Sequence, residues 1–344
     1  MSKVYISIAL YNGRAYLPDL FQSINEQSFK DFTVIAIDNA SADGGADWIR
    51  REYPETVILR NHKNLGFAKA HNQAIELAAK LGRGESNQYV LVTNQDLILD
   101  HKFLEEIVDV ADRYMEFGAF GGKVFKMFKA ADGVAPDKSN IIDTAGLIIK
   151  KSRRVFDRGM GEADKGDYEK IESVFGISGA LVLYRMSDLA RASINNNYFD
   201  SSYFCYKEDV DLAWRMQNLG IKSLYAPKAL AYHYRGAYRA AKTKWQIFKS
   251  LFSDKRSPLI NQWSYRNQWS TILKNDRLIN FLLHSPWILV EELQRFARYL
   301  IFLDFKCIAA ALSAWLKIED ILKWRREVKN KGRVPATEIR KWFK

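Results

Sequence analysis

The sequence predicts an α/β protein with a mostly parallel central sheet and flanking helices, followed by a helical C-terminal extension. Short apolar runs typical of buried strands alternate with segments of helical apolar spacing through the first third of the chain. Strands that alternate with helices imply crossover connections, which join parallel strands. Beyond residue 240 the pattern is one of helices that carry Leu, Ile, Phe and Trp among Lys and Arg.

The first strands and helices are predicted in alternation. Apolar runs rich in β-branched residues predict strands over residues 3–10, 32–37, 57–60 and 89–93. Helical spacing of apolar residues predicts helices over residues 16–27, 46–52, 67–81 and 101–115. Pro18 near the start of the first helix and the small polar Ser41 ahead of the second are typical of helix N-termini.

The middle of the chain is more polar. Residues 125–172 contain several glycines and predict loops and a hairpin. Apolar spacing then predicts a helix that begins near Asp209 and ends at Gly220, a residue typical of helix C-caps. A strand-like run follows at residues 222–226, just before Pro227.

Composition narrows the class of protein. The chain has 344 residues, 48% hydrophobic and 27% charged, which excludes a disordered, collagen-like or disulfide-framework protein. Cys205 and Cys307 lie far apart and match no metal or redox spacing, which indicates a reducing compartment. The N-terminus shows no cleavage site, so we expect no signal peptide.

The glycine signatures of dinucleotide folds and P-loops are absent, so carboxylates and a metal would have to hold any nucleotide.

Polar clusters follow three of the predicted strands: Tyr11-Asn12, Asp38-Asn39 and Asn94-Gln95-Asp96. Ligands bind at the carboxyl edge of open parallel sheets, so three clusters in equivalent positions favour a binding site, although turns also select Asn and Asp. Asp96 is either a ligand of a hard divalent cation or a cap of the following turn.

Two further positions carry groups that suit proton transfer or metal binding. Glu208 and Asp209 lie in the first turn of a predicted helix. Acids there either stabilise the helix dipole or, when a pocket exposes them, accept a proton. His233 follows a strand-like run and is either a structural histidine or a metal ligand.

As a set, the motifs resemble glycosyltransferase family 2, and most of all its bacterial rhamnosyltransferase and galactofuranosyltransferase branch. The resemblance covers about residues 3–236 and rests on the order and spacing of short motifs at residues 6–12, 38–44, 64–72, 94–96, 176–180, 207–212 and 233. It implies a GT-A fold, which is Rossmann-like. It also implies the inverting transfer of a sugar from a nucleoside diphosphate to an acceptor hydroxyl.

The resemblance implies roles for individual residues. Asp209 matches the catalytic base, with Glu208 beside it, and Asp96 and His233 match the ligands of Mg²⁺ or Mn²⁺. The D-x-D-like motif of the family reads Asn94-Gln95-Asp96 here, so an amide replaces the first carboxylate but can still bind a ribose hydroxyl. We assign the nucleotide-sugar site to Tyr11, Asp38, Asn39, Asn64, Gly66, Asn72 and Asn94, and the acceptor site to Gly179 and Trp214.

Two features bear on the acceptor. Gly179 precedes an apolar strand, so it either lets an acceptor sugar approach the backbone or relieves tight packing. Residues 125–172 would form a lid or an acceptor-binding insertion.

We expect two regions, a catalytic domain over residues 1–236 and a basic helical region over residues 237–344. Residues 235–344 carry 23 Lys and Arg against 9 Asp and Glu. Seven of the nine tryptophans also lie there: Trp245, Trp263, Trp269, Trp287, Trp315, Trp324 and Trp342. The apolar segments are too short to span a bilayer, so these helices suit an anionic membrane surface, a soluble subdomain or a homodimer interface.

We therefore expect a cytoplasmic enzyme, peripheral on the inner face of the cell membrane, that acts in cell-surface polysaccharide synthesis. Its donor would be a dTDP- or UDP-sugar, with rhamnose as the first candidate, and its acceptor a glycan or a lipid-linked glycan. Two alternatives stay open. Asn94 suggests a catalytically weak or inactive sugar-nucleotide-binding scaffold, and the isoelectric point of about 9.4 suggests a nucleic-acid-binding protein. No nucleic-acid-binding motif is present, so we expect no nucleic-acid partner.

Overall fold

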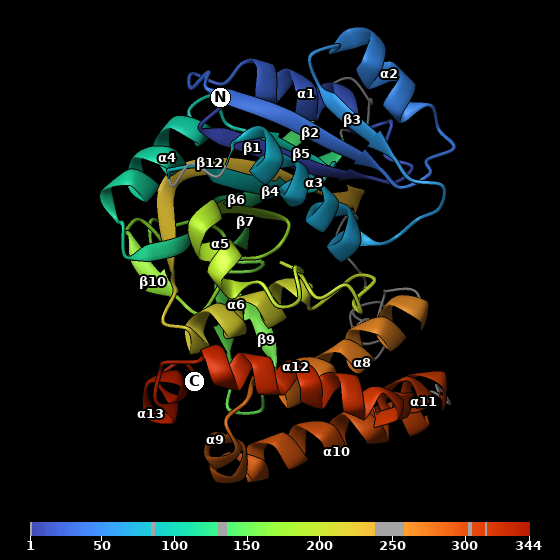
Figure 1. Ribbon diagram of the computed structural model, residues 1–344, viewed down its shortest axis with the longest axis vertical. Helices are drawn as coiled ribbons and strands as arrows, with labels where there is room; N and C mark the ends of the chain where they lie inside the picture. The colour runs from blue at the N-terminus through green and yellow to red at the C-terminus, as the bar shows by residue number, and fades with distance from the viewer. Residues whose placement is uncertain (1, 84–86, 130–135, 238–257, 302–304, 314) are drawn as a thin grey trace.

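A computed structural model describes residues 2–83, 87–129, 136–237, 258–301, 305–313 and 315–344. Helices cover both faces of a ten-stranded sheet, and further helices form a layer at one end of the molecule (Figure 1). The strands are β1 (Val4–Leu10), β2 (Phe32–Asp38), β3 (Val57–Arg60), β4 (Tyr89–Thr93), β5 (Leu97–Leu99), β6 (Phe117–Lys129), β7 (Pro136–Thr144), β8 (Leu147–Ile149), β9 (Val155–Asp157), β10 (Glu172–Val174), β11 (Leu181–Arg185) and β12 (Lys222–Ala237).

The helices divide between the sheet and the C-terminal layer. Those of the α/β body are α1 (Leu17–Asn25), α2 (Gly45–Glu52), α3 (Phe67–Leu81), α4 (Phe103–Arg113), α5 (Met186–Ala192) and α6 (Glu208–Asn218). Those of the C-terminal layer are α8 (Pro258–Asn275), α9 (Leu278–Leu283), α10 (Ser285–Ile301), α11 (Phe305–Ser313), α12 (Ile318–Lys331) and α13 (Ala336–Arg340), with a 3₁₀ turn at Trp315–Lys317.

The sheet brings the three predicted polar clusters to one edge. Its strand order is β10-β12-β6-β11-β4-β1-β2-β3, and β5 and β7 pair with β12 and β6. The strands β3, β2, β1 and β4 are parallel, and their register places Leu10 beside Asp38 and Ile8 beside Thr93. The predicted α/β class with a mostly parallel sheet core is therefore confirmed.

Two hydrophobic clusters bury the opposite faces of the sheet. On one face Ile6 of β1 packs in a cluster with Leu20 of α1 and Ile107 of α4. On the other face Ile35 of β2 packs in a cluster with Ala74 of α3. Because both faces are covered, these strands are apolar at nearly every position rather than at alternate ones.

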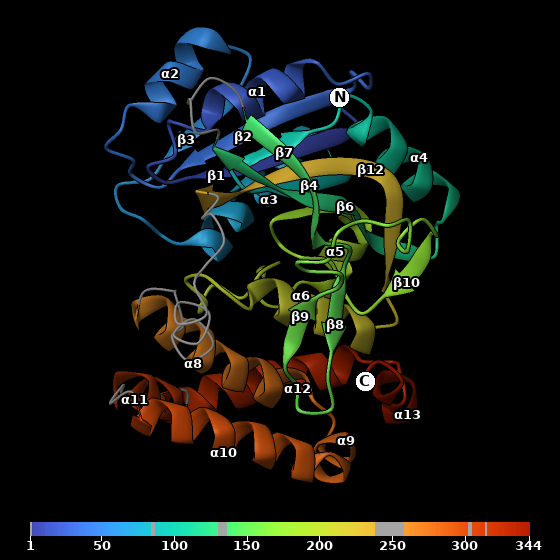
Figure 2. The ribbon, with the colours of Figure 1, turned by 180° about the vertical axis from the view of Figure 1, so that it is seen from behind.

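The segment after α4 contains more strand than the sequence predicts. β6 runs for 13 residues and pairs with β7, β11 and β12. β8 and β9 form a separate hairpin, which reaches from the sheet toward the C-terminal helices in Figure 2. The hairpin predicted within residues 125–172 is present, as the antiparallel pairs β6–β7 and β8–β9, but the segment holds more strand and less loop than predicted. The first half of β7 is a polar, largely exposed edge strand, so no apolar run marks it.

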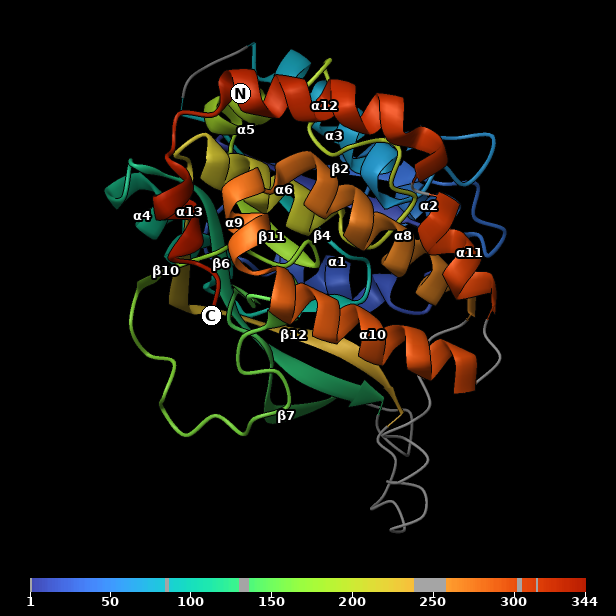
Figure 3. The same ribbon diagram turned by 90° about the horizontal axis from the view of Figure 1, so that it is seen from below.

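The C-terminal helices pack directly on the α/β body. One hydrophobic cluster joins Val210 and Trp214 of α6 with Ile272 of α8 and with Ile339 and Phe343 near the C-terminus. Seen from below in Figure 3, α8, α10 and α12 cover this end of the molecule, and Figures 1 and 2 show that α10 lies farther from the sheet than α8 and α12. The predicted boundary at residue 236 falls at the end of β12. It stays a prediction, and residues 238–257, with Trp245, lie outside the described residues.

Candidate active site

The carboxyl ends of β1 and β4 are joined by the side chain of Gln95. Its amide accepts a hydrogen bond from the Tyr11 N–H at 3.1 Å and donates one to the Tyr11 carbonyl at 3.0 Å. A Cβ atom on Gly13 would overlap the Gln95 side chain at 2.1 Å, so glycine allows this contact. Gln95 thus fixes Tyr11, which is 49% exposed at the edge of the sheet.

The end of β2 organises the neighbouring loops. Asp38 is buried and accepts a hydrogen bond from the Ser41 N–H at 2.9 Å. The Asn39 amide donates to the Gly66 carbonyl at 3.2 Å, and Asn64 accepts a hydrogen bond from the Gly66 N–H at 2.8 Å. Gly66 has a φ of +81°, a conformation that favours glycine, and it ends the turn before α3. These predicted nucleotide-sugar residues therefore form one connected edge.

Asp96 and His233, the predicted metal ligands, lie side by side. β5 pairs with β12, and Asp96 Oδ1 lies 3.3 Å from His233 Nε2. The other ring nitrogen, Nδ1, lies 2.9 Å from Asp143, which also accepts two hydrogen bonds from Arg235 at 2.8 and 2.7 Å. Burial opposes the charged form of His233, but the hydrogen bonds to Asp143 and Asp96 outweigh it and raise the His233 pKa.

This pair fits a divalent cation in place of the imidazole proton. Because Asp143 holds Nδ1, the Nε2 atom of His233 is directed toward Asp96, and after deprotonation of His233 both side chains would be available as ligands. Within the described ranges, no group of three or more His, Cys, Asp or Glu side chains is arranged to hold a metal. The protein would supply two ligands and leave the remaining positions to diphosphate oxygens and water.

Glu208 and Asp209 begin α6 in different environments. Asp209 is partly exposed and accepts hydrogen bonds from the N–H groups of Gly179 at 2.9 Å and Val210 at 2.8 Å. Glu208 is 6% exposed, and its Oε2 has no partner among the described residues. Burial, together with the charge of Asp209, raises the pKa of Glu208 to about 8. Asp209 is therefore the accessible candidate for a general base.

Backbone contacts connect Asp209 with the end of β4. The Asn94 N–H donates to the Ala180 carbonyl at 2.9 Å, and the preceding Gly179 holds Asp209. Asp96 lies two residues beyond Asn94, so the candidate base and the Asp96–His233 pair lie near the same strand end. A Cβ atom on Gly179 would lie 3.0 Å from the Cβ of Asp209, which explains the glycine by packing. The acceptor contact at Gly179 stays a prediction.

Helix α8 holds the segment that leads into Glu208. Tyr206 and Lys207 adopt left-handed φ angles of 70° and 74°, which are unfavourable for residues with a Cβ atom. The amide of Asn267 is fully buried and donates to the carbonyls of Cys205 at 3.0 Å and Tyr206 at 2.8 Å. These hydrogen bonds stabilise the strained turn just before the candidate base.

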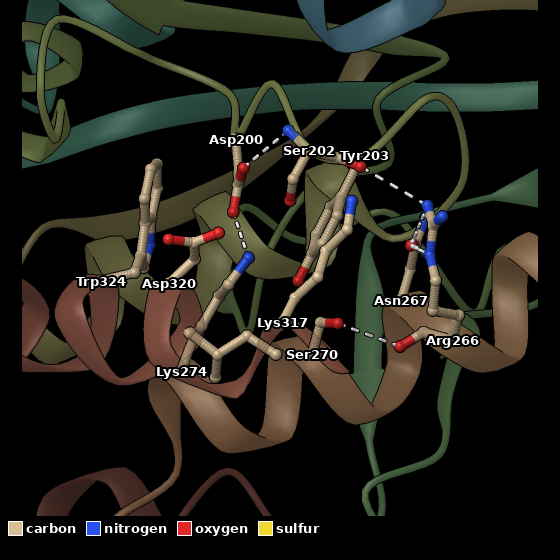
Figure 4. Close-up of a pocket in the computed structure, with 11 residues that line it drawn as sticks. Asp200, Ser202, Tyr203, Arg266, Asn267, Ser270, Lys274, Lys317, Asp320 and Trp324 are labelled. Atoms are coloured by element: carbon tan, nitrogen blue, oxygen red, sulfur yellow. Dashed lines mark hydrogen bonds and ion pairs between the residues drawn. The ribbon is translucent and has the colours of Figure 1, made fainter. Parts of the chain in front are cut away.

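A cavity of about 120 Å³ separates the same segment from α12 (Figure 4). On its wall, Lys274 of α8 forms an ion pair with Asp200. The Tyr203 hydroxyl lies 3.0 Å from the Thr271 hydroxyl of α8. The C-terminal helices thus anchor residues 200–206, a role that the sequence does not predict.

Two residues predicted to contact substrate have their side chains engaged within the protein. Trp214 is 1% exposed and packs against Phe175 and Phe343. Five residues after Asp209 on a helix, it faces a different side, so we leave it out of the acceptor site. Asn72 uses its amide within the protein, donating to the Phe199 carbonyl and accepting from the Phe199 N–H, both at 2.8 Å. Its contact with a nucleotide sugar stays a prediction.

Sequence reasoning missed three residues that organise the site: Gln95, Asp143 and Asn267. Gln95 lies inside a predicted polar cluster, so its position was a usable signal. Asp143 lies 90 residues from His233, and Asn267 lies 62 residues from Cys205. A single polar residue in an edge strand or a helix forms no local pattern, so only the fold reveals these partners.

The fold is similar to that of a solved structure titled as GalNAc-T7 with UDP, GalNAc and Mn²⁺. The TM-score is 0.56 at 11% identity, and the match covers 80% of this chain and 48% of that one. The chain therefore spans about half the length of that structure, and at this identity the likeness concerns the fold alone.

Two curated relatives match most of the chain. One is an N-acetylglucosaminyl-diphospho-decaprenol L-rhamnosyltransferase of Mycobacterium tuberculosis, 26% identical over 247 residues, with 65% of this chain and 74% of the relative covered. The other is the rhamnosyltransferase WbbL of Escherichia coli K12, 25% identical over 248 residues, with 67% and 83% covered.

A family model described as glycosyl transferase family 2 matches residues 5–187. This range contains the parallel strands, the polar clusters at their ends and Asp96. The match covers more than half of the chain and agrees with the GT-A-like arrangement of the sheet. The resemblance found in the sequence motifs is confirmed, and the chain belongs to glycosyltransferase family 2, as a glycosyltransferase of the rhamnosyltransferase-like branch.

Proposed function

We propose that this glycosyltransferase moves a sugar from a nucleoside diphosphate to an acceptor hydroxyl with inversion and depends on a divalent cation. One observation carries the proposal: the Asp96–His233 pair and Asp209 lie at one sheet edge, connected through the Asn94–Ala180 hydrogen bond. A carboxylate–imidazole pair suits a cation that binds a diphosphate, and a separate carboxylate suits proton removal.

In this proposal Asp209 accepts the proton of the acceptor hydroxyl while the oxygen forms a bond to the anomeric carbon. The bond between that carbon and the diphosphate oxygen breaks in the same step, and the nucleoside diphosphate leaves with the electron pair. A single displacement inverts the configuration and needs no covalent enzyme intermediate. Glu208 is protonated at neutral pH because its pKa is raised to about 8, so it does not compete for the proton.

Asp96 and His233 would hold the cation, and Asp143 would keep the imidazole oriented. When bound, the cation neutralises the negative charge that develops on the leaving diphosphate. An imidazole ligand favours Mn²⁺ over Mg²⁺, whose shell prefers oxygen ligands, so we expect the higher activity with Mn²⁺.

The donor site would lie along the ends of β1, β2 and β4. Tyr11 and Asp38 would contact the base, and the Asn94 amide would bind a ribose hydroxyl. Two relatives are named rhamnosyltransferases, which makes dTDP-rhamnose the first donor to test, ahead of UDP-galactose and UDP-galactofuranose. The name of the mycobacterial relative also supports a lipid-linked glycan as the acceptor, with a role in cell-surface polysaccharide synthesis.

We also propose that α9 and α10 rest on an anionic membrane at the inner face of the cell. Their outward side chains are 43–59% exposed and include Leu282, Trp287, Leu289, Leu293, Phe296 and Leu300. A contiguous apolar face of this kind is typical of helices in the membrane interface. Among the described residues, no helix is both long enough and apolar enough to cross a bilayer.

The acids of α10 support this orientation because they turn toward the protein. Glu291 lies 3.4 Å from Arg154, and Glu292 lies 3.0 Å from Arg295 and accepts a hydrogen bond from Tyr265 at 2.5 Å. The outward face is therefore free of these carboxylates, and the basic excess of residues 235–344 attracts anionic lipid headgroups.

A nucleotide-sugar screen tests the transfer proposal. Thermal unfolding is followed with dTDP-rhamnose and the UDP-sugars, with and without Mn²⁺, because ligands of the folded state raise the unfolding midpoint. The donor that stabilises the protein is then incubated with a lipid-linked acceptor, and the glycosylated product is identified by mass spectrometry. Stabilisation by none of these nucleotide sugars in either condition would contradict the proposal.

Liposome sedimentation tests the membrane proposal. The variant Leu293→Glu/Phe296→Glu is expected to remain in the supernatant of anionic vesicles at low salt, because charge replaces the apolar face. The control Leu322→Glu changes a similarly exposed leucine on α12 and should sediment like the parent protein. The membrane proposal would be wrong if the parent protein did not bind these vesicles. If the parent then formed a dimer that the double variant did not form, the apolar face would be a dimer interface instead.

A further inference from the structure

A carboxylate beside the proposed site has no role in the mechanism above. Asp157 of β9 is in register with Leu147 of β8, so the two side chains share one face of the hairpin. Leu147 belongs to the hydrophobic cluster of Val210, the residue after Asp209. The register therefore places Asp157 on the face of the hairpin that packs against α6.

Asp157 also lies near Asp143, the residue that orients His233 of the metal pair. The Thr144 hydroxyl favours the charged form of Asp157, and Asp143, the residue before Thr144, holds His233 at 2.9 Å. Burial and the charges of Asp209 and Asp143 raise the pKa of Asp157 to about 6. Asp157 therefore lies near enough to the candidate base, Asp209, and to Asp143, the support of the metal pair, for both charges to act on it.

No ion pair joins Asp157 to a basic residue in the part of the chain that the structure describes. Arg235 acts on it electrostatically but is hydrogen-bonded through two nitrogens to Asp143. Arg158 donates to the Ala145 carbonyl at 2.9 Å and pairs with Glu172. The Oδ1 atom of Asp157 is buried without a hydrogen-bond partner among the described residues.

An unpartnered buried carboxylate oxygen lowers the stability of a folded protein, so packing alone does not explain Asp157. A substrate that enters the site can supply the missing donor. A sugar held between a diphosphate-binding pair and a base presents hydroxyl groups, which are strong donors to a carboxylate.

We propose that Asp157 is a substrate-binding residue whose Oδ1 accepts a hydrogen bond from a sugar hydroxyl between the Asp96–His233 pair and Asp209. This inference rests on the proposed transfer reaction. The transferred sugar and the acceptor sugar offer the same hydroxyl chemistry, and kinetics with each substrate varied in turn distinguish them.

The test compares Asp157→Asn with Asp167→Asn, a control in an exposed turn. We expect kcat/KM for one sugar substrate to fall about 10- to 100-fold in Asp157→Asn, because an amide replaces a charged acceptor. The unfolding midpoint should stay equal or rise, since the variant removes a buried carboxylate, and the control should match the parent. A higher KM for the donor assigns the hydroxyl to the transferred sugar, and a higher KM for the acceptor assigns it to the acceptor.

Deoxy analogues of the affected substrate identify the hydroxyl itself. For the analogue that lacks it, parent and Asp157→Asn should react equally fast, because neither can make the contact. The role of Asp157 would be overturned if Asp157→Asn had the parental kcat and KM for both substrates. It would also be overturned if the variant lost the same activity relative to the parent with every analogue. A parent protein that shows no transfer would instead overturn the proposed function.

Discussion

The two halves of the candidate active site are built differently. In the strand-end half (Tyr11, Asp38 and Asn94), each residue ends or directly follows a strand of the parallel sheet. In the assembled half (His233 and Asp209), the functional residues are held by partners from distant parts of the chain. The first half depends on the sheet as a whole. The second depends on single long-range hydrogen bonds, so individual substitutions should damage it selectively.

The largest effect on the assembled half is expected from Asp143→Asn. The variant removes the carboxylate that orients His233 and receives Arg235. Loss of such a support typically costs about 10- to 100-fold in metal affinity or activity. Titration of activity with Mn²⁺ should show a raised half-saturation concentration, while nucleotide-sugar binding along the strand-end half persists. An unchanged Mn²⁺ requirement would show that the His233 orientation does not depend on Asp143.

A smaller effect is expected from Asn267→Ala on α8. The variant loses both hydrogen bonds to the left-handed turn before Glu208, so Asp209 should be less well positioned. We expect kcat to fall about tenfold with little change in donor KM. The matched control is Gln262→Ala on the same helix, for which we expect parental kinetics. If Asn267→Ala kept the parental kcat, the hydrogen bonds from α8 would not contribute to the positioning of Asp209.

The smallest effect on the activity of the assembled half is expected from Glu208→Gln, whose main consequence is a pH-dependent gain in stability. The folded protein raises the Glu208 pKa from 4.5 to about 8, so it binds more protons than the unfolded chain between these values. Its free energy of unfolding therefore falls as the pH rises from about 4.5 to 8. Glutamine removes this loss, so the advantage of the variant should grow by about 3 to 4 kcal/mol between pH 5 and pH 8. Urea unfolding at pH 5 and pH 8 measures the difference in free energy of unfolding between the variant and the parent. If this difference were the same at both pH values, Glu208 would not be protonated in the folded protein at neutral pH.

The strand-end half could be predicted from sequence because its signals are local. The strands Val57–Arg60 and Tyr89–Thr93 and the helix Phe67–Leu81 agree with the sequence prediction to the residue. Their apolar runs and helical spacing arise from burial on the sheet, which each segment shows by itself.

The supports of the assembled half could not be predicted. Asp143 lies near the end of β7, which begins as a polar edge strand without an apolar pattern. Asn267 lies in helix α8, and the sequence pattern of that helix does not mark its amide as buried. Their significance comes from contacts that form only when the chain folds.

The most direct test of the central claim is the affinity for dTDP, measured by calorimetry with and without Mn²⁺ in the parent protein, His233→Ala and Asp209→Asn. If Asp96 and His233 hold the cation and Asp209 acts only on the acceptor, Mn²⁺ should tighten dTDP binding at least about tenfold in the parent and in Asp209→Asn, but not in His233→Ala. An equal effect of Mn²⁺ in His233→Ala would contradict the account.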